Sequence, residues 1–485
     1  MSRRLLSTLF GTVSIVLSDN LGASAASVPP HARQAPSCFP VDPQDTIADR
    51  MNAVLSAPSA TGYSLKLCPD TNYPISAPIK FAFPNQEITT EGFPGLDLSR
   101  RATLTVNGPI NADGTGHTTA VDGTCANCIS VSLRYVQIHG NRGSGPVVGG
   151  ANIEFGGNNQ NQVIEWVHSE KPRSWSCLHV AEGPFTCANA LIQNNDIGPC
   201  GTDDFQQWAD GISLSCKGSN VFNNTIIGAT DGGIVVFGSP GSWIHENTIR
   251  AGDAMLLGGI NLVDYAPWDG DYTGVVVENN QILGGFATSV TDPATDQGKN
   301  PEGAFIKIGI AMGPHTWFGD KFGMSLNRGA VVRNNTFQGA FGYAMAAASV
   351  SNFTVYGNTI DEDVTFIGSV GPNCSTTDAT PEPAPFVFNS SQVFDSSMQQ
   401  AFVDRDADAL TCILPDNDDW WPYVPPTTTA SSATPTGSTE AASKSSAAPL
   451  AVGLTIGILG AVVLSYGLRA WYMRRREASS KAQLY

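Results

Sequence analysis

Apolar residues between positions 187 and 360 occur in short runs that are bounded by glycine and polar turns. Runs such as 212–214 and 234–237 are too short for helices but have the length of β-strands. A turn of the form Asn-x-(Ile/Phe) recurs between them, beginning at Asn195, Asn224, Asn247, Asn280, Asn335 and Asn358. Repeats of this length predict an all-β solenoid, a right-handed parallel β-helix in which each coil places equivalent side chains in a stack.

The spacing of this turn gives the expected length of a coil. Two of the gaps are 23 residues (247 − 224 and 358 − 335), and the others are 29, 33 and 55. We interpret the gaps of 29 and 33 as one coil with an insertion, and the gap of 55 as one coil with an insertion or as two coils. Residues 266–274 and 287–303 interrupt the repeat, and long insertions in a solenoid project from one face and often line the binding groove.

The sequence also predicts a helical cap at the start of the solenoid. Thr46 is a candidate N-cap, and Ile47, Met51, Val54 and Leu55 then lie on one helical face. Such a helix would cover the open end of the first coil, where apolar surface and unpaired strand edges are otherwise exposed. Residues 63–67 and 75–79 are the first expected strands.

Both ends of the chain resemble targeting elements. Residues 1–25 have the charged start, apolar run and small-residue site of a signal peptide, and residues 26–370 are the expected β-helix ectodomain. An acidic extension at 371–424, linked by cysteine, and a Ser/Thr/Pro-rich stalk at 425–449 follow. Residues 450–468 are long and apolar enough for a transmembrane helix, and the basic tail at 469–485 predicts a single-pass type I protein at the cell surface.

The ten cysteines suit an oxidising compartment. Pairing neighbours in the sequence predicts the disulfides Cys38–Cys68, Cys125–Cys128, Cys177–Cys187, Cys200–Cys216 and Cys374–Cys412. Glycosylation motifs, among them one at Asn223 and one at Asn334, agree with an exported glycoprotein. The net charge of −17 argues against nucleic acid as a partner.

Carboxylates follow three successive turn asparagines at similar distances. Asp203 and Asp204 come eight and nine residues after Asn195, Asp231 seven after Asn224, and Asp253 six after Asn247. Because coils are about 4.8 Å apart, the outer members of such a column would lie roughly 9–10 Å from each other. An inverting glycosidase needs an acid and a base about 6.5–9.5 Å apart, so these four residues are candidate catalytic groups. The alternative is that they are solvated turn residues, since Asp-Gly is a common turn pair.

Four further residues are candidates for substrate binding. Asp210 opens the run at 212–214, and Trp208 and Trp243 offer apolar faces for sugar rings. Arg250 can hold a uronate carboxylate through two parallel hydrogen bonds, or it can pair with a neighbouring aspartate. The histidines show no metal-ligand spacing, and we predict no metal site.

These features together resemble the pectate lyase-like superfamily of right-handed β-helix proteins. The resemblance rests on the cap at 45–55, the strand at 63–67 before Tyr73-Pro74-Ile75, and the Asn-x-Ile ladder. Within the superfamily, residues 187–249 resemble fungal secreted members. Thr202-Asp203-Asp204 is similar to the Asp-Asp motif of polygalacturonases, but the Gly-His-Gly and Arg-Ile-Lys motifs of those enzymes are absent from the sequence. The resemblance implies a β-helix fold and activity toward a carbohydrate.

Three functions remain open from the sequence. The first is hydrolysis of a cell-wall or extracellular polysaccharide by paired aspartates, without a cofactor. The second is a calcium-dependent lyase acting on uronates, in which Arg250 or Lys307 is the base. The third is a non-catalytic surface protein that binds glycans. In each case the expected partners are a polysaccharide and the membrane, and the expected state is a monomer.

Overall fold

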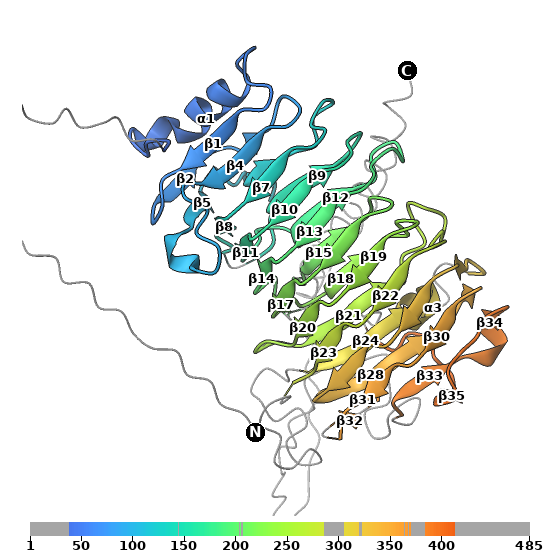
Figure 1. Ribbon diagram of the computed structural model, residues 1–485. Helices are drawn as coiled ribbons and strands as arrows, with labels where there is room; N and C mark the ends of the chain where they lie inside the picture. The colour runs from blue at the N-terminus through green and yellow to red at the C-terminus, as the bar shows by residue number, and fades with distance from the viewer. Residues whose placement is uncertain are drawn as a thin grey trace, which may run out of the picture. The chain divides into compact units, whose positions relative to one another are not determined.

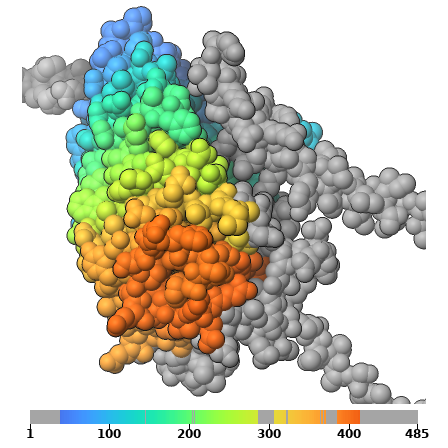
Figure 2. All heavy atoms as spheres, turned by 90° about the vertical axis from the view of Figure 1, so that its right-hand side faces the viewer, coloured from blue at the N-terminus to red at the C-terminus, as the bar shows by residue number. Residues whose placement is uncertain are grey.

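The computed structural model describes residues 38–412 with some gaps, which are 144, 203, 205–206, 286–304, 320–322, 363, 367 and 370–383. Within these residues the chain winds through successive coils, and each coil contributes short strands to three parallel sheets (Figure 1). Figure 2 shows the same coils as successive bands in chain order. The predicted parallel β-helix is therefore confirmed for this part of the chain.

The first and second sheets each contain one short strand from almost every described coil. The first sheet runs in the order β1 (Ser64–Leu67), β4 (Glu87–Thr90), β7 (Ser132–Arg134), β10 (Val163–Glu165), β13 (Leu191–Gln193), β16 (Asn220–Phe222), β19 (Trp243–His245), β22 (Val276–Glu278), β26 (Val331–Arg333) and β30 (Thr354–Tyr356). The second sheet runs in the order β2 (Asn72–Ile75), β5 (Ala102–Val106), β8 (Val136–His139), β11 (His168–Glu170), β14 (Asp196–Ile197), β17 (Thr225–Ile227), β20 (Thr248–Arg250), β23 (Gln281–Leu283), β27 (Thr336–Gln338) and β31 (Thr359–Ile360).

The third sheet has the longest strands. Its order is β3 (Ile79–Lys80), β6 (Val121–Asp122), β9 (Ile153–Gly156), β12 (Ser176–Ala181), β15 (Asp210–Leu214), β18 (Gly232–Val236), β21 (Leu256–Leu262), β24 (Ile306–Met312), β28 (Ala340–Ala347), β33 (Phe386–Phe388) and β35 (Phe402–Asp404), with β32 (Thr365–Phe366) also beside β28. A small sheet joins β25 (Asn327–Arg328), β29 (Val350–Ser351) and β34 (Val393–Phe394).

The turn asparagines form a hydrogen-bonded ladder between the first and second sheets. Asn224 Nδ2 donates to Asn247 Oδ1 at 2.9 Å, and Asn247 Nδ2 donates in turn to Asn280 Oδ1 at 2.9 Å. Asn280 Nδ2 reaches Asn335 Oδ1 at 2.9 Å, so the 55-residue gap is one coil with an insertion rather than two coils. Each amide satisfies buried backbone groups of the neighbouring coil, which is why the turn repeats so faithfully.

The first coil is covered by a helix, as predicted. A 3-10 turn at Gln44–Thr46 leads into α1 (Ile47–Leu55), which buries Ile47, Met51 and Leu55. The capping role predicted for Thr46 is wrong, because its side chain makes no capping hydrogen bond. The hydroxyl instead faces Pro43 O at 3.4 Å. Among the described residues the other short helical segments are Leu98–Arg100, α3 (Pro314–Phe318) and Ser390–Gln392.

The described disulfides are of two kinds, since some join neighbouring coils and Cys125–Cys128 closes a local turn. The bonds Cys38–Cys68 and Cys125–Cys128 are confirmed. The predicted pairs Cys177–Cys187 and Cys200–Cys216 are wrong, because the structure has Cys177–Cys200 and Cys187–Cys216. Their separations of 23 and 29 residues match coil lengths, since winding brings together residues one coil apart. Cys412 is disulfide-bonded, and its predicted partner Cys374 lies outside the described residues.

Several predicted segments lie outside the described residues. They are the signal peptide at 1–25, the stalk at 425–449, the span at 450–468, the tail at 469–485 and the whole insertion at 287–303. In the part of the chain that the structure does describe, every helix is too short or too polar to span a bilayer. Residues 384–412 of the predicted extension add β33 and β35 to the third sheet.

Candidate functional site

Several buried polar and ionisable side chains lie on the outer surface of the third sheet. Adjacent strands align Glu154 of β9 with His179 of β12, and His179 with Ser213 of β15. The same row continues through Val235 of β18 to Asn261 of β21. We call the part of this surface that bears Glu154, His179, Asp210, Ser213 and Asp231 the acidic face.

Stacked glycines allow the strands of the third sheet to pack closely. Gly211, Gly233, Gly259 and Gly309 stack on successive coils, and each precedes an isoleucine. A Cβ at Gly211 would lie 2.5 Å from Gly233 O, and one at Gly233 would lie 2.6 Å from Gly259 O. Side chains at these positions would clash with the next strand, so the stacked glycines allow the coils to pack closely.

Asp210 is held at the first position of β15 by two donors. Ser213 Oγ donates to Asp210 Oδ2 at 2.8 Å, and the Gly232 N–H donates to Asp210 Oδ1 at 3.1 Å. Ser213 Oγ also lies 2.8 Å from Ser176 Oγ. Asp210 is 4% exposed, and it lies on the coil next to the partly exposed Asp231.

The surroundings of Asp210 favour the protonated form of its carboxyl group. Burial raises the pKa of the Asp210 carboxyl well above its usual range, and the negative charges of Asp231 and Asp264 raise it further. The hydrogen bond from Ser213 opposes this rise in pKa but does not reverse it. A carboxyl of this kind keeps its proton at a pH where an ordinary aspartate has lost it.

Two polar atoms on the same outer row lack a partner within the described residues. His179 Nδ1 is 2.7 Å from Glu154 Oε2, while His179 Nε2 makes no hydrogen bond to any described group. Asn261 is 1% exposed, and its Oδ1 is likewise without a described partner. Buried polar atoms are costly when unpaired, so both positions are suited to the hydroxyl groups of a ligand or to water.

The neighbouring loops are held by buried arginine and by disulfide bonds. Arg142 donates to Pro172 O, Ser174 O and Gln207 O, which fixes the loop that contains Trp208. The bond Cys177–Cys200 ties β12 to the turn that precedes this loop. Trp208 packs against a second apolar cluster that covers the C-terminal part of the third sheet, and this cluster includes Trp317 of α3.

Lys307 is a further buried ionisable group on the third sheet. It lies on β24 and is 1% exposed, with its Nζ 6.0 Å from the centre of the Phe305 ring. Burial lowers the pKa of the Lys307 amine well below its usual range. Such an amine is neutral at a lower pH than the amine of an exposed lysine, so a larger fraction of it is free to accept a proton near neutral pH.

The predicted column of aspartates does not form as expected. Gly232 pairs with Gly258, which places Asp231 beside Leu257, whereas Asp253 lies four residues earlier (257 − 253) in an exposed turn. Asp204 is exposed in the loop before β15, and Asp203 lies outside the described residues. The physical reason is variable turn length, since 8 residues separate Asn224 from Gly232 but 11 separate Asn247 from Gly258.

The predicted binding residues are divided among the sheets. Asp210 and Trp208 lie at or beside the third sheet, but Arg250 ends β20 in the second sheet and Trp243 begins β19 in the first. Sequence reasoning did not identify Glu154, His179 or Asn261 as part of the site. The repeated Gly-Ile pairs were a usable signal, because they mark the register of the third sheet.

Comparison with known proteins identifies the fold. Residues 185–380 match the family model described as the right handed beta helix region. The fold is a right-handed parallel β-helix. The predicted resemblance to pectate lyase-like proteins is thus confirmed at the level of fold. No protein of curated function matches the sequence.

Solved structures with a similar fold include three carbohydrate-active enzymes. An alginate lyase from Paenibacillus sp. str. FPU-7 is 12% identical with a TM-score of 0.40, covering 66% of this chain and 95% of that chain. The catalytic domain of a GH87 alpha-1,3-glucanase in complex with tetrasaccharides is 13% identical with a TM-score of 0.41, covering 79% and 70%. A DFA-IIIase from Arthrobacter chlorophenolicus A6 is 13% identical with a TM-score of 0.43, covering 75% and 85%. At such identities the similarity concerns the fold alone.

The described residues contain no group of three or more His, Cys, Asp or Glu side chains placed to hold a metal ion.

Proposed function

We propose that this protein hydrolyses an extracellular polysaccharide at the acidic face, with Asp210 and Asp231 as the acid–base pair. The observation that carries the proposal is the raised pKa of buried Asp210 beside a second carboxylate on the next coil. Glycoside hydrolysis needs one carboxyl group that donates a proton and one that accepts a proton at the same pH. Neighbouring carboxyls with separated pKa values meet that requirement.

In the proposed reaction Asp210 and Asp231 together lose one proton and gain one. Asp210 donates its proton to the glycosidic oxygen as the bond from that oxygen to the anomeric carbon breaks. Asp231, which is partly exposed, takes a proton from the water that attacks the anomeric carbon. One proton leaves the pair and one enters it, so the starting state is restored when the protons redistribute.

Two buried acceptor positions support a ligand rich in hydroxyl groups. When His179 Nδ1 carries a hydrogen and donates to Glu154, His179 Nε2 is an acceptor. Asn261 Oδ1 is another acceptor on the same row of outward side chains. Both atoms are buried from solvent, so a buried water molecule, or a sugar hydroxyl that displaces it, would supply the missing donor.

The test compares the carboxyl pair with other acids in the same region. Asp210→Asn and Asp231→Asn are assayed for new reducing ends on a panel of neutral glucans, chitin fragments and uronate polymers. Asp204→Asn and Asp253→Asn are the matched controls, because both acids are exposed and lie outside the acidic face. We expect turnover to fall only in the first two variants. Turnover that persists in both of them would remove the pair from the mechanism.

A lyase is the second candidate, and the buried amine of Lys307 favours it. A neutral amine can remove the proton next to a uronate carboxylate, after which the glycosidic oxygen leaves and an unsaturated product forms. That product absorbs in the near ultraviolet, whereas a hydrolysis product does not. Loss of ultraviolet-absorbing product in Lys307→Met, or on addition of a chelator, would favour the lyase. Glycan binding without any product would favour a purely binding function.

We also propose that the protein is exported and anchored at the cell surface by one span at 450–468. The four disulfides described above support an oxidising environment. Protease treatment of intact cells tests this arrangement. An antibody to the acidic face should lose its signal, while one to the tail at 469–485 should keep it.

A further inference from the structure

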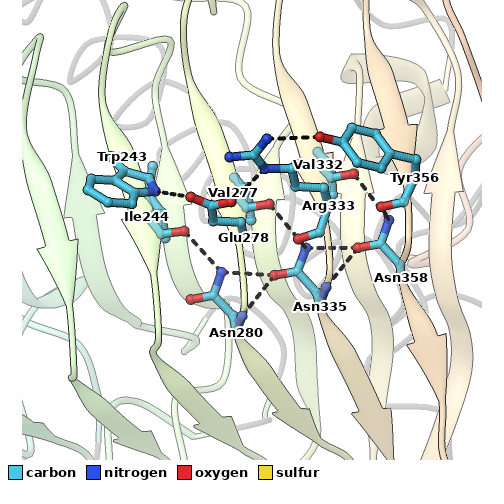
Figure 3. A network of polar contacts seen from close by, with 10 residues as sticks. All are labelled: Trp243, Ile244, Val277, Glu278, Asn280, Val332, Arg333, Asn335, Tyr356 and Asn358. Atoms are coloured by element: carbon cyan, nitrogen blue, oxygen red, sulfur yellow. Dashed lines mark hydrogen bonds and ion pairs between the residues drawn. The ribbon is translucent and has the colours of Figure 1, made fainter.

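A second cluster of side chains lies on the outer surface of the first sheet, where the mechanism uses no residue. Trp243 of β19, Glu278 of β22, Arg333 of β26 and Tyr356 of β30 come from four successive strands (Figure 3). Together with His245 we call these residues the Trp243 platform. It is separate from the acidic face because it belongs to another sheet.

A chain of hydrogen bonds holds the indole in place. Trp243 Nε1 donates to Glu278 Oε1 at 2.7 Å, and Arg333 Nε donates to Glu278 Oε2 at 2.5 Å (Figure 3). Arg333 Nη1 donates in turn to the Tyr356 hydroxyl at 2.8 Å. The hydrogen bond from Arg333 is the main reason that the pKa of Glu278 lies below its usual range. Glu278 therefore stays ionised, and the network persists under mildly acidic conditions.

Stacking fixes the orientation of the same indole. The ring of Trp243 lies over His245 with centroids 3.7 Å apart and an interplanar angle of 23°. His245 stacks in turn on Phe222 with centroids 4.9 Å apart. Trp243 is nevertheless 44% exposed, whereas His245 is 7% exposed. The tryptophan thus covers the histidine and keeps a substantial part of its own surface in contact with solvent.

The surroundings of the exposed indole are polar. On the adjacent strands Asn220 and the partly exposed Val276 align with Trp243, and Glu278 accepts from its Nε1. Asn220 Oδ1 also lies 2.9 Å from His245 Nε2. A protein interface has an apolar centre of several large side chains, and this arrangement does not supply one. A pyranose ring has an apolar C–H face and a rim of hydroxyls, which matches one exposed aromatic ring with the polar groups of Asn220 and Glu278 at its edge.

The charges favour a neutral sugar. Glu278 and Arg333 form an ion pair and compensate each other within the platform. The whole chain carries a net charge of −17, which disfavours approach of an anionic polymer. Because the indole is already fixed, little side-chain freedom is lost when a ligand stacks on it.

We propose that the Trp243 platform binds a neutral hexopyranose polysaccharide, with one sugar ring stacked on the indole and its hydroxyls contacting the polar rim. The Tyr356 ring is 43% exposed and lies three strands further along, roughly 14 Å away by strand spacing. A glycan chain that runs along the axis of the β-helix can contact both rings. This inference does not depend on hydrolysis at the acidic face.

The test measures binding of the full-length chain, purified in detergent, to insoluble neutral polysaccharides. Depletion isotherms on α-glucan, β-glucan and chitin particles compare wild type with Trp243→Ala, Trp243→Phe and Glu278→Gln. Phe185→Ala is the matched control, because Phe185 is also 44% exposed but lies outside the platform. Circular dichroism and the melting temperature establish that each variant is folded.

We expect Trp243→Ala to weaken binding about two- to tenfold, the range that a single aromatic stacking contact supplies. Trp243→Phe should retain part of the affinity, and Phe185→Ala should bind as wild type does. Folded Trp243→Ala that binds every polysaccharide as tightly as wild type would overturn the proposal. A change in self-association on ultracentrifugation, without a change in glycan binding, would also overturn it and assign the platform to a second copy.

Asp231→Asn separates this proposal from the proposed catalysis. If hydrolysis is absent in wild type but binding still depends on Trp243, the platform stands and the catalytic assignment fails. If hydrolysis depends on Asp231 but binding is indifferent to Trp243, the platform fails and the catalytic assignment stands.

Discussion

Two outer surfaces of the same β-helix differ in how far their functional side chains are exposed to solvent. On the third sheet Asp210, His179 and Asn261 are buried. On the first sheet Trp243 and Tyr356 are exposed and held by a network of hydrogen bonds (Figure 3). Burial is the main cause of the raised pKa of Asp210, whereas an exposed flat ring is a surface on which a sugar can stack. The two surfaces therefore suit the two different proposals, hydrolysis at the acidic face and glycan binding at the Trp243 platform.

The difference has a structural cause. The apolar cluster that includes Trp317 covers the C-terminal part of the third sheet, and loops tied down by Arg142 border the acidic face. In the described residues no comparable apolar cluster covers the first sheet. Coverage by loops, rather than the strands themselves, therefore decides which surface becomes a low-dielectric environment.

The largest expected effect is on turnover. Asp231→Asn should lower kcat about 10²–10⁴-fold, because general acid–base groups typically contribute that much. Trp243→Ala should leave turnover of a short soluble oligosaccharide unchanged, since such a substrate need not contact the first sheet. Reducing-end assays on both variants check the contrast. An equal loss of turnover in the two variants would mean that the two surfaces act as one site.

The ladder asparagines connect the coils beneath both surfaces. A substitution in the ladder should therefore lower the stability of the whole β-helix. Asn247→Ala should lower the free energy of unfolding by about 3 kcal/mol, because the Asn224 backbone N–H and Val221 O lose the hydrogen bonds that Asn247 makes to them in the interior. Urea denaturation measures this value. Exposed Lys217→Ala is the control and should change stability by about 0.5 kcal/mol or less. Equal stabilities of the two variants would contradict the role of the ladder.

Buried Asp210 should reduce stability at neutral pH. Its folded-state pKa is raised above that of the unfolded chain, so its favourable contribution is present below about pH 4 and is lost as the pH rises through the folded-state pKa. Asp210→Asn should therefore have a higher melting temperature than wild type at pH 7, and the difference should disappear toward pH 3. The amide can still accept from the Gly232 N–H.

Melting curves across this pH range test the prediction for Asp210. A variant less stable than wild type at pH 7 would show that the carboxyl is not held in its neutral form. Glu278 offers the opposite case on the first sheet, since its pKa is lowered and its contribution to stability is lost only as the pH falls.

The smallest expected effect is at the rim of the Trp243 platform. Tyr356→Phe removes the hydroxyl that accepts from Arg333 but keeps an aromatic ring. Affinity for a neutral polysaccharide should fall about twofold or less, which is smaller than the loss in Trp243→Ala. The same depletion isotherm measures both. A larger loss in Tyr356→Phe would mean that the hydroxyl, rather than the indole, dominates recognition.

Some features of the site could not be predicted because they depend on turn lengths. The sequence aligned Asp231 with Asp253 by counting from the ladder, but three additional residues before Gly258 shift the third-sheet register (11 − 8). Asp210 became the neighbour of Asp231 for the same reason. The disulfides were mispaired because nearness along the chain was used where nearness across coils applies.

The sequence by itself determined the repeating unit of this protein. The Asn-x-(Ile/Phe) turn and the short apolar runs specify coils, because each ladder amide satisfies its neighbours and each apolar run must be buried. Only the tertiary structure decided which side chains share an outer surface and which of them are covered. Those outcomes depend on the summed lengths of turns and on loops from distant coils, and neither leaves a local pattern in the chain.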